Sequence, residues 1–285
     1  MSAPLVDIEA LRFAYPGASS PALDGLDLRV AEGEAVALVG PSGSGKSTLA
    51  RLLAGLAVPE GARRAAVCGH DLLDARGRLD ARRDVGILFQ DPETQLVAED
   101  VEADVAFGLE NLGWPPERMK ARVEEMLAAF DLGGLRERAP HLLSGGQKQR
   151  TALAGVLAIP RRVLVLDEPT AMLDPGGRDE VLAAVRRVRA EGLATVYVTQ
   201  EMGEVGLADR VVALERGTAV FDGTPRELFA DLGLVTRLQL GLPPAAEVAL
   251  ALGGRPEVES GTGAAGAALP LTLDELVSLL AGGDA

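Results

Sequence analysis

Residues 34–56 read EAVALVGPSGSGKSTLARLLAGL, and this stretch decides the fold class. It begins with a continuous apolar run, which is typical of a strand buried on both faces of a sheet. A glycine-rich turn follows at residues 40–45, and the residues after the turn favour a helix. A buried strand, a tight turn and a helix in this order predict one unit of an α/β fold with a largely parallel sheet.

The turn in this stretch fits the phosphate-loop pattern, with glycine at positions 40 and 45 followed by Lys46 and Ser47. In such a loop the backbone N–H groups converge on phosphate oxygens, the lysine reaches the β and γ phosphates, and the hydroxyl binds Mg²⁺. A glycine-rich turn without a ligand is the alternative, and the flanking strand and helix make it weak. The residues expected to hold the nucleotide here are Gly40, Pro41, Ser42, Gly43, Ser44, Gly45, Lys46, Ser47 and Thr48.

A second buried strand, in RRVLVLDEP, ends at the acidic pair Asp167 and Glu168. Open parallel sheets bind ligands at the carboxyl ends of their strands. We therefore expect Asp167 to hold Mg²⁺, directly or through water, and Glu168 to polarise a water in line with the γ-phosphate. Taken alone, such a pair is equally compatible with a solvated loop, and the phosphate loop in the same chain favours the functional interpretation.

The rest of the chain divides into segments of different character. Alternating apolar residues over 6–15 and 26–30 predict antiparallel strands before the phosphate loop, and ATVYVTQ, residues 194–200, predicts another buried strand. The chain is mostly helical from 91 to 142, where Met119, Val123, Leu127 and Phe130 mark one apolar face. A hairpin turning at residues 216–217 precedes a capping box at Thr224 and Glu227, and a second box is expected at Thr272 and Glu275.

Composition excludes several classes of protein. The 28 basic and 42 acidic residues give a net charge of −14, which repels nucleic-acid phosphates and argues against DNA or RNA as a partner. Cys68 is the only cysteine, so no intrachain disulfide is expected. His70 and His141 are the only histidines, so a zinc cluster is not expected either. The start lacks the pattern of a signal peptide and no run of 18 apolar residues occurs, so we expect a soluble chain that reaches a membrane only through other subunits.

One further motif carries a family resemblance. LSGGQ, residues 143–147, looks like a helix N-terminus that presents N–H donors. With a phosphate loop before it and an Asp-Glu strand after it, the chain resembles the ATP-binding subunit of an ABC transporter. The resemblance implies that two such subunits meet head to tail with ATP and Mg²⁺ between the phosphate loop of one and the LSGGQ of the other. Ser144, Gly145, Gly146 and Gln147 would then contact the partner's ATP, the alternative being a plain helix cap.

Other residues match that family one at a time. Tyr15 resembles the aromatic residue that stacks on adenine, although a core tyrosine would read the same way. Gln90 resembles the glutamine whose amide reaches Mg²⁺ or the attacking water and which moves with the membrane subunit. Asp174, with Leu173 before it, resembles the loop that contacts the partner subunit; in isolation it would be only a turn.

One position departs from the family pattern. The family usually has a histidine that contacts the γ-phosphate where this chain has Gln200. An amide can donate a hydrogen bond but cannot titrate near neutral pH. We expect Gln200 to position the γ-phosphate while Glu168 supplies the main polarisation; the rival interpretation is a site that binds ATP and hydrolyses it poorly.

The stretch DPETQLVAEDVEADVAFGLENLG, residues 91–113, resembles the energy-coupling factor branch of the family. This implies an importer of a vitamin or of cobalt or nickel ions, with a second ABC ATPase, a transmembrane coupling protein and a membrane substrate-binding subunit as partners at the cytoplasmic face. A groove near Gln90 and the acidic stretch 99–104 would receive the coupling protein, the alternative for each carboxylate being a solvated helix face. Non-transport ABC ATPases of chromosome maintenance or translation are the rivals, disfavoured because no coiled coil and no second cassette occur.

The expected organisation is an ABC ATPase domain over residues 1–230 and a C-terminal extension over residues 231–285. The first would contain an antiparallel β subdomain and the helical subdomain at about 91–142. In the extension, a Gly-rich and Ala-rich linker at 253–267 precedes an amphipathic helix in TLDELVSLL, which suggests a role in dimerisation.

Overall fold

A computed structural model describes residues 3–252 and 269–281. Its larger sheet has six strands in the order β10-β9-β3-β8-β7-β6. The neighbours from β9 to β6 pair in parallel, and only β10 runs antiparallel. The strands are β3 (Ala35–Val39), β6 (Val85–Leu88), β7 (Val163–Asp167), β8 (Ala194–Val198), β9 (Arg210–Glu215) and β10 (Thr218–Gly223). Every residue of β3, β7 and β8 is buried, so the expected parallel sheet with buried central strands is confirmed.

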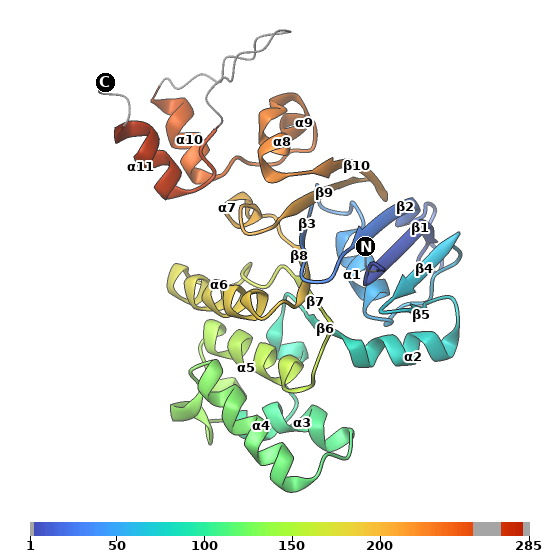
Figure 1. The fold of residues 1–285 in the computed structure, drawn as a ribbon, viewed down its shortest axis with the longest axis vertical. Coiled ribbons are helices and arrows are strands. Elements are labelled where there is room, and N and C mark those ends of the chain that lie inside the picture. Colours follow the sequence, from blue (N-terminus) through green and yellow to red (C-terminus); the bar gives the residue numbers. More distant parts are fainter. Residues whose placement is uncertain (1–2, 253–268, 282–285) are drawn as a thin grey trace.

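The smaller sheet is antiparallel and has the order β2-β1-β4-β5. It consists of β1 (Val6–Phe13), β2 (Leu23–Val30), β4 (Arg64–Val67) and β5 (His70–Asp71). Apolar residues of both sheets and of α1 (Lys46–Leu53) form one buried cluster, which fixes α1 between the sheets (Figure 1). Cys68 belongs to this cluster, and burial raises the pKa of its thiol to about 11, so the thiol is inert at neutral pH.

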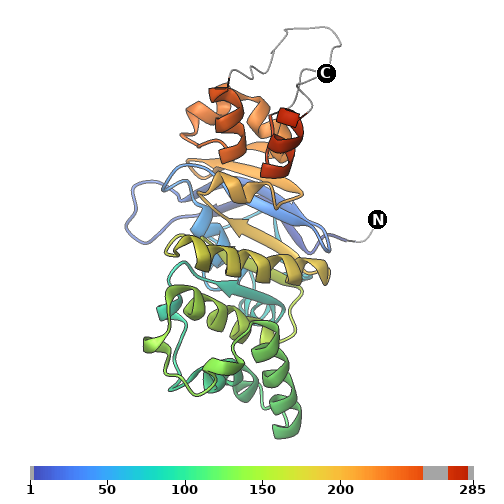
Figure 2. The same ribbon diagram turned by 90° about the vertical axis from the view of Figure 1, so that its left-hand side faces the viewer.

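The segment between β6 and β7 is helical and lies at one end of the molecule (Figures 1 and 2). The apolar face expected on α4 buries Val123 and Leu127, with Phe130 directly after the helix and Met119 half-buried. Outside this segment, α2 (Ala75–Asp84) follows β5, and α6 (Pro175–Ala190) packs on α5 (Gly145–Ala158). The segment comprises η1 (Pro92–Thr94), α3 (Val101–Asn111), α4 (Pro116–Ala129), η2 (Gly133–Leu135), η3 (Pro140–Leu142) and α5 (Gly145–Ala158).

The C-terminal helices lie at the opposite end (Figure 1). The hairpin forms as predicted, with positive φ at Arg216 and Gly217, and so does the capping box at Thr224 and Glu227. Half of the second box forms, because Glu275 N donates to Thr272 Oγ1 while the Glu275 carboxylate accepts from Leu271 N. The expected linker at 253–267 lies outside the described residues, and the division at residue 230 stays a prediction. The helices at this end are α8 (Pro225–Ala230), α9 (Leu232–Arg237), α10 (Pro244–Ala251) and α11 (Leu273–Ala281), while α7 (Met202–Val205) lies beside the central sheet.

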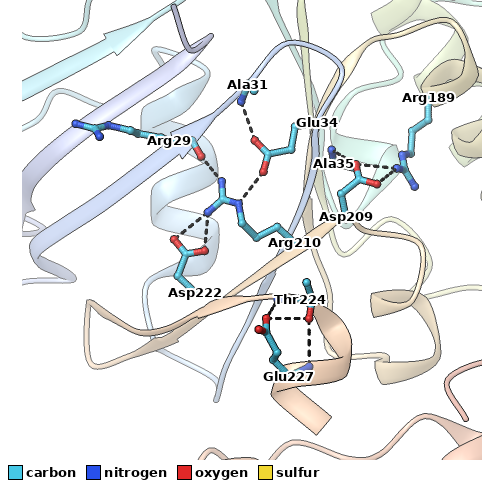
Figure 3. Close-up of polar contacts among 10 residues, drawn as sticks. All are labelled: Arg29, Ala31, Glu34, Ala35, Arg189, Asp209, Arg210, Asp222, Thr224 and Glu227. Atoms are coloured by element: carbon cyan, nitrogen blue, oxygen red, sulfur yellow. Dashed lines mark hydrogen bonds and ion pairs between the residues drawn. The ribbon is translucent and has the colours of Figure 1, made fainter. Parts of the chain in front are cut away.

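Polar contacts join the two sheets at the amino ends of β3 and β9 (Figure 3). The Arg210 guanidinium donates to Glu34 Oε1 at 2.6 Å, to Asp222 on β10 at 2.6 Å, and to the Arg29 carbonyl of β2. Asp209 accepts from Ala35 N at 2.8 Å and from Arg189 at 3.1 Å. The amino-end edge of the sheet is thus cross-linked by side chains, and the carboxyl-end edge carries the residues described next.

Candidate nucleotide site

The phosphate loop connects β3 to α1, and two of its glycines are required by packing. Gly40 has φ 137° and Gly45 has φ 106°, values that side-chain-bearing residues rarely adopt. A Cβ at Gly40 would lie 2.1 Å from the Leu214 carbonyl oxygen, and one at Gly45 would lie 2.5 Å from that of Ala22. At Gly43, with φ 77°, a Cβ would meet nothing within 4 Å. The loop is therefore pressed against β9 and residue 22 on one side and open on the other.

Lys46 lies at the centre of this loop with its ammonium group turned inward. Its Nζ donates to the carbonyl oxygens of Gly40 at 2.8 Å and Pro41 at 3.0 Å, and to Ser44 Oγ at 3.3 Å. Burial lowers the pKa of Lys46, and the neighbouring carboxylates of Glu168 and Asp167 oppose this shift. A buried positive charge bonded mainly to neutral oxygens fits a site whose ligand is a polyanion.

Ser47 and Asp167 come together from α1 and β7. Ser47 Oγ donates to Asp167 Oδ1 at 2.9 Å, and burial raises the pKa of this carboxyl while the hydrogen bond opposes the shift. Within the described residues no group of three or more His, Cys, Asp or Glu side chains could hold a metal ion. One hydroxyl and one carboxylate oxygen fit Mg²⁺, which is bound by few protein ligands together with phosphates and water.

The three residues expected to act in hydrolysis meet at one carboxylate. Gln200 Nε2 donates to Glu168 Oε1 at 2.6 Å, and Gln90 Nε2 donates to the other oxygen, Oε2, at 3.1 Å. Glu168 has φ 50°, a strained value for a residue with a long side chain, and its N–H donates to the Val198 carbonyl at 2.9 Å. This bond ties the end of β7 to the end of β8 and fixes the backbone from which the carboxylate projects.

Tyr15 is not a core residue, since 42% of it is exposed. Its ring meets the Phe13 ring edge-on, with centroids 5.0 Å apart, and its hydroxyl lies 3.1 Å from Thr48 Oγ1. A groove of about 510 Å³ runs from this ring to the carboxylate described above. The groove is lined by Tyr15, Ser20, Pro21, Ala22, Ser42, Gly43, Ser44, Gly45, Lys46, Ser47, Thr48, Glu168 and Gln200.

The LSGGQ residues lie outside this groove, at the start of α5. Ser144 Oγ accepts from Gln147 N at 3.3 Å and Gln147 Oε1 accepts from Ser144 N at 3.0 Å, so both form a capping box. A Cβ at Gly146 would lie 2.9 Å from the Gly177 Cα of α6. Gly145 lines a separate groove of about 300 Å³ together with Gln90 and Leu173. The chain therefore does not bring its own LSGGQ to its own phosphate loop.

Asp174 also has a local role, because its carboxylate caps α6 by accepting from Gly177 N at 2.7 Å.

Sequence reasoning missed Ser20, Pro21 and Ala22, which line the groove although no motif marks them. The only signal was indirect: a glycine at position 45 that cannot bear a Cβ requires a close neighbour, and residue 22 is that neighbour.

Comparisons with known proteins agree with this geometry. Residues 23–171 match the family model described as "ABC transporter". The chain is 48% identical to the energy-coupling factor transporter ATP-binding protein EcfA1 of Symbiobacterium thermophilum, over 98% of each chain. It is 41% identical to the EcfA1 of Clostridium perfringens, over 87% of this chain and 90% of that protein.

Solved structures give the same result. The structure of cbiO1 from Clostridium perfringens, described as part of the ABC transporter complex cbiONQ, superposes with a TM-score of 0.75 at 32% identity and covers 88% of this chain and 100% of its own. The ATP-binding cassette MJ0796, solved as a dimer in a post-hydrolysis state bound to ADP and Pi, gives 0.70 at 26% identity, over 78% and 99%. The chain belongs to the ATP-hydrolysing, ATP-binding proteins of the ABC transporter family, in its energy-coupling factor branch.

Proposed function

We propose that this chain hydrolyses ATP to drive uptake of a micronutrient, a vitamin or a cobalt or nickel ion, through separate membrane subunits. The observation that carries the proposal is the contact of Gln90 with Glu168 at 3.1 Å. Gln90 belongs to the proposed hydrolytic centre and also begins the segment that leads to the exposed surface of the helical end. Gln90 would therefore couple hydrolysis at Glu168 to the segment on which a membrane partner docks.

Within one chain, the ring of Tyr15 would stack on adenine, and Lys46 would pair with the β and γ phosphates, which is supported by their positions in one groove. Ser47 and Asp167 would hold Mg²⁺, which screens the phosphate charge. Glu168 would accept a hydrogen bond from the attacking water, while Gln90 and Gln200 keep its carboxylate aimed.

The second half of each ATP site would come from another ABC ATPase subunit, identical or related. Ser144 to Gln147 lie outside the lining of the chain's own groove, and the helix start that they form would present N–H groups suited to a phosphate. Two subunits related by a two-fold axis would each supply one phosphate loop and one LSGGQ. The dimeric state of MJ0796 in its structure supports this arrangement.

The membrane partners would dock on the helical end beyond Gln90. Val97 and Phe107 are exposed, 60% and 47% respectively. The Asp104 carboxylate accepts from Val97 N at 3.2 Å, and Asp104 lies about one helical turn before Phe107 on α3, so Val97 and Phe107 belong to the same part of the surface. Asp104 and Asp100 accept hydrogen bonds from backbone N–H groups of their own segment, the latter as the cap of α3. The exposed apolar side chains therefore give the stronger support for a docked helix. Among the described residues, no helix meets the length and hydropathy needed to span a bilayer. The relatives' description as transporter ATP-binding proteins supports a location at the cytoplasmic face, where the partners would hold the chain.

The test is affinity purification of the tagged chain from detergent-solubilised membranes of its host, with Phe107→Asp compared with wild type. The matched control is Leu79→Asp, since Leu79 is 57% exposed and lies on α2, outside the helical segment that follows Gln90. We expect wild type and the control to retain a multi-spanning coupling protein and a small membrane substrate-binding protein, and Phe107→Asp to lose both.

Recovery of chromosomal or ribosomal proteins alone would contradict the importer proposal.

A regulatory subunit with little turnover is the second candidate, favoured by Gln200 in place of the usual histidine. Phosphate release by the purified complex separates the two, because a regulatory subunit would bind ATP without releasing phosphate at a rate above that of Glu168→Gln.

A further inference from the structure

Glu204 is a buried carboxylate that the nucleotide site does not include. It lies on the short helix α7, directly after β8 and the Gln200 turn, and only 4% of it is exposed. A buried carboxylate is costly unless hydrogen-bond donors surround it. The donors around Glu204 therefore indicate why the fold keeps it.

Three hydroxyl groups converge on the two oxygens of this carboxylate. Thr170 Oγ1 donates to Oε1 at 2.6 Å, while Tyr197 Oη and Thr199 Oγ1 donate to Oε2 at 2.7 and 2.8 Å. Arg178 Nε of α6 lies 3.8 Å from Oε1. Burial, reinforced by the Glu204 charge, raises the pKa of Tyr197 well above its usual value, so the phenol stays a donor.

Two of the three donors adjoin the hydrolytic centre. Thr170 follows Glu168 by two residues, in a turn closed by a bond from Ala171 N to the Glu168 carbonyl at 3.2 Å. Thr199 directly precedes Gln200, and its Oγ1 also accepts from Glu201 N at 2.9 Å, so one hydroxyl fixes the backbone on both sides of Gln200. Glu204 thus joins the turn after β7 to the turn after β8.

The same carboxylate neighbours the start of α6. Arg178 lies one turn after the helix cap Asp174, to whose carbonyl its N–H bonds at 2.9 Å, and its Nη2 pairs with Glu201 at 3.1 Å. The loop at Asp174, the turn at Glu168 and the turn at Gln200 are therefore each linked to Glu204 through one residue, namely Arg178, Thr170 and Thr199 respectively.

We propose that Glu204 is a positioning residue for ATP hydrolysis, which holds Thr170 and Thr199 so that the Gln200 amide meets the Glu168 carboxylate. The amide needs such an anchor because only its nitrogen end donates, and a rotated turn would present the oxygen end to the carboxylate. The inference rests on the proposed roles of Glu168 and Gln200.

Isosteric variants separate positioning from stability. Thr199→Val and Thr170→Val each remove one hydroxyl from Glu204, and the control Thr195→Val removes a buried hydroxyl at the other end of β8, where Oγ1 donates to the Leu193 carbonyl at 3.2 Å. We expect kcat of the purified full chain to fall about tenfold in the first two, with KM for ATP within about twofold, because small misplacements of reacting groups are costly. The control should lose melting temperature to a similar extent but keep its kcat.

Glu204→Gln completes the test, since it keeps the shape and removes the charge to which the hydroxyls donate. It should lower kcat as Thr199→Val does, and combining the two should cost little more than either alone. Equal kcat losses in all three threonine variants, or no loss in Thr199→Val and Thr170→Val, would overturn the proposal.

Hydrogen exchange keeps this result distinct from a failure of the proposed function. In Glu204→Gln, peptides spanning 168–174 and 199–202 should exchange faster than in wild type, and unchanged exchange in both would overturn the inference. If Glu168→Gln hydrolysed ATP as wild type does, the proposed role of Glu168 would fail, while the exchange data would still decide whether Glu204 fixes the two turns. Neither measurement requires the membrane subunits.

Discussion

The phosphate-loop edge and the LSGGQ turn both present N–H donors at a helix start, but they differ in what surrounds them. Around the phosphate loop, Lys46 donates to the loop itself, Asp167 at the end of β7 accepts from Ser47, and Glu168 accepts from Gln200 after β8. Around Ser144 the contacts are its own capping box and the packing of Gly146 on α6. We call the first the complete region, because the groups proposed to hold Mg²⁺ and to polarise the water all come from one chain. We call the second the donor region, because its helix start lies outside the groove of the same chain. The difference supports the proposal of a site shared between two subunits.

The largest expected effect concerns the complete region. Glu168→Gln should lower phosphate release by about 10²-fold or more, because an amide is a poor base and the Gln200 and Gln90 amides would lose their charged acceptor. Binding of a fluorescent ATP analogue should persist, since Lys46 and the loop are untouched. Glu117→Gln, on the exposed first turn of α4, is the control that should change neither quantity. Wild-type turnover in Glu168→Gln would remove Glu168 from the chemistry.

The next effect concerns the donor region. Gly146→Ala should lower ATP-dependent dimerisation and kcat by about tenfold, because its Cβ would lie 2.9 Å from the Gly177 Cα and push α5 away from α6. Light scattering with ATP and phosphate release measure the two effects. The control Gly133→Ala changes a glycine of η2 whose added Cβ would meet nothing within 4 Å.

Mixing these variants sharpens the comparison. A dimer of one Glu168→Gln chain and one Gly146→Ala chain contains one site with an intact Glu168 from one subunit and an intact LSGGQ from the other. Equimolar mixing should therefore restore phosphate release above the sum of the separate variants, whereas two independent sites would show only the sum. Absence of restoration in a mixture that dimerises would contradict the shared site.

A smaller effect is expected at Gln200. Gln200→Ala should lower kcat several-fold, because Glu168 loses the donor at 2.6 Å and keeps only Gln90. Gln200→His restores a donor of similar reach and should retain or raise kcat. Single-turnover phosphate release measures both variants against wild type, and wild-type values in both would remove any role of Gln200 in positioning.

The parts of the site that were predictable are those whose chemistry is contiguous in the sequence. The phosphate loop and the Asp167–Glu168 pair were read from short stretches because each stretch contains its own strand and its own functional side chains. The apolar face of α4 and the hairpin at Arg216 were predicted for the same reason, since periodicity and turn chemistry are local signals.

The unpredicted parts depend on packing between distant segments. The amides of Gln90 and Gln200 reach Glu168 from 78 and 32 residues away, and no local pattern states that they share one carboxylate. The expectation that the acidic stretch at 99–104 faces a partner stays a prediction, and within that stretch Asp100 and Asp104 bond to backbone N–H groups of their own segment. A carboxylate's choice between a partner and a nearby N–H is decided by the fold.

The smallest effect tests whether contacts outside the nucleotide sites also hold subunits together. The last helices leave Val248, Leu252, Leu273 and Val277 exposed, between 45% and 70% each, which is unusual for so short a segment. We expect a chain truncated after Gly241 to keep its kcat at saturating ATP. Its self-association without ATP should be about tenfold weaker, as measured by sedimentation equilibrium. The double variant Val277→Ser, Leu273→Ser should reproduce the shift without removing backbone, whereas Leu79→Ser on α2 should not. If the ATP-free oligomer is unchanged in the truncated chain, dimerisation depends on the ATP-bridged contacts alone. The complete region of one subunit and the donor region of the other would then form the whole subunit interface.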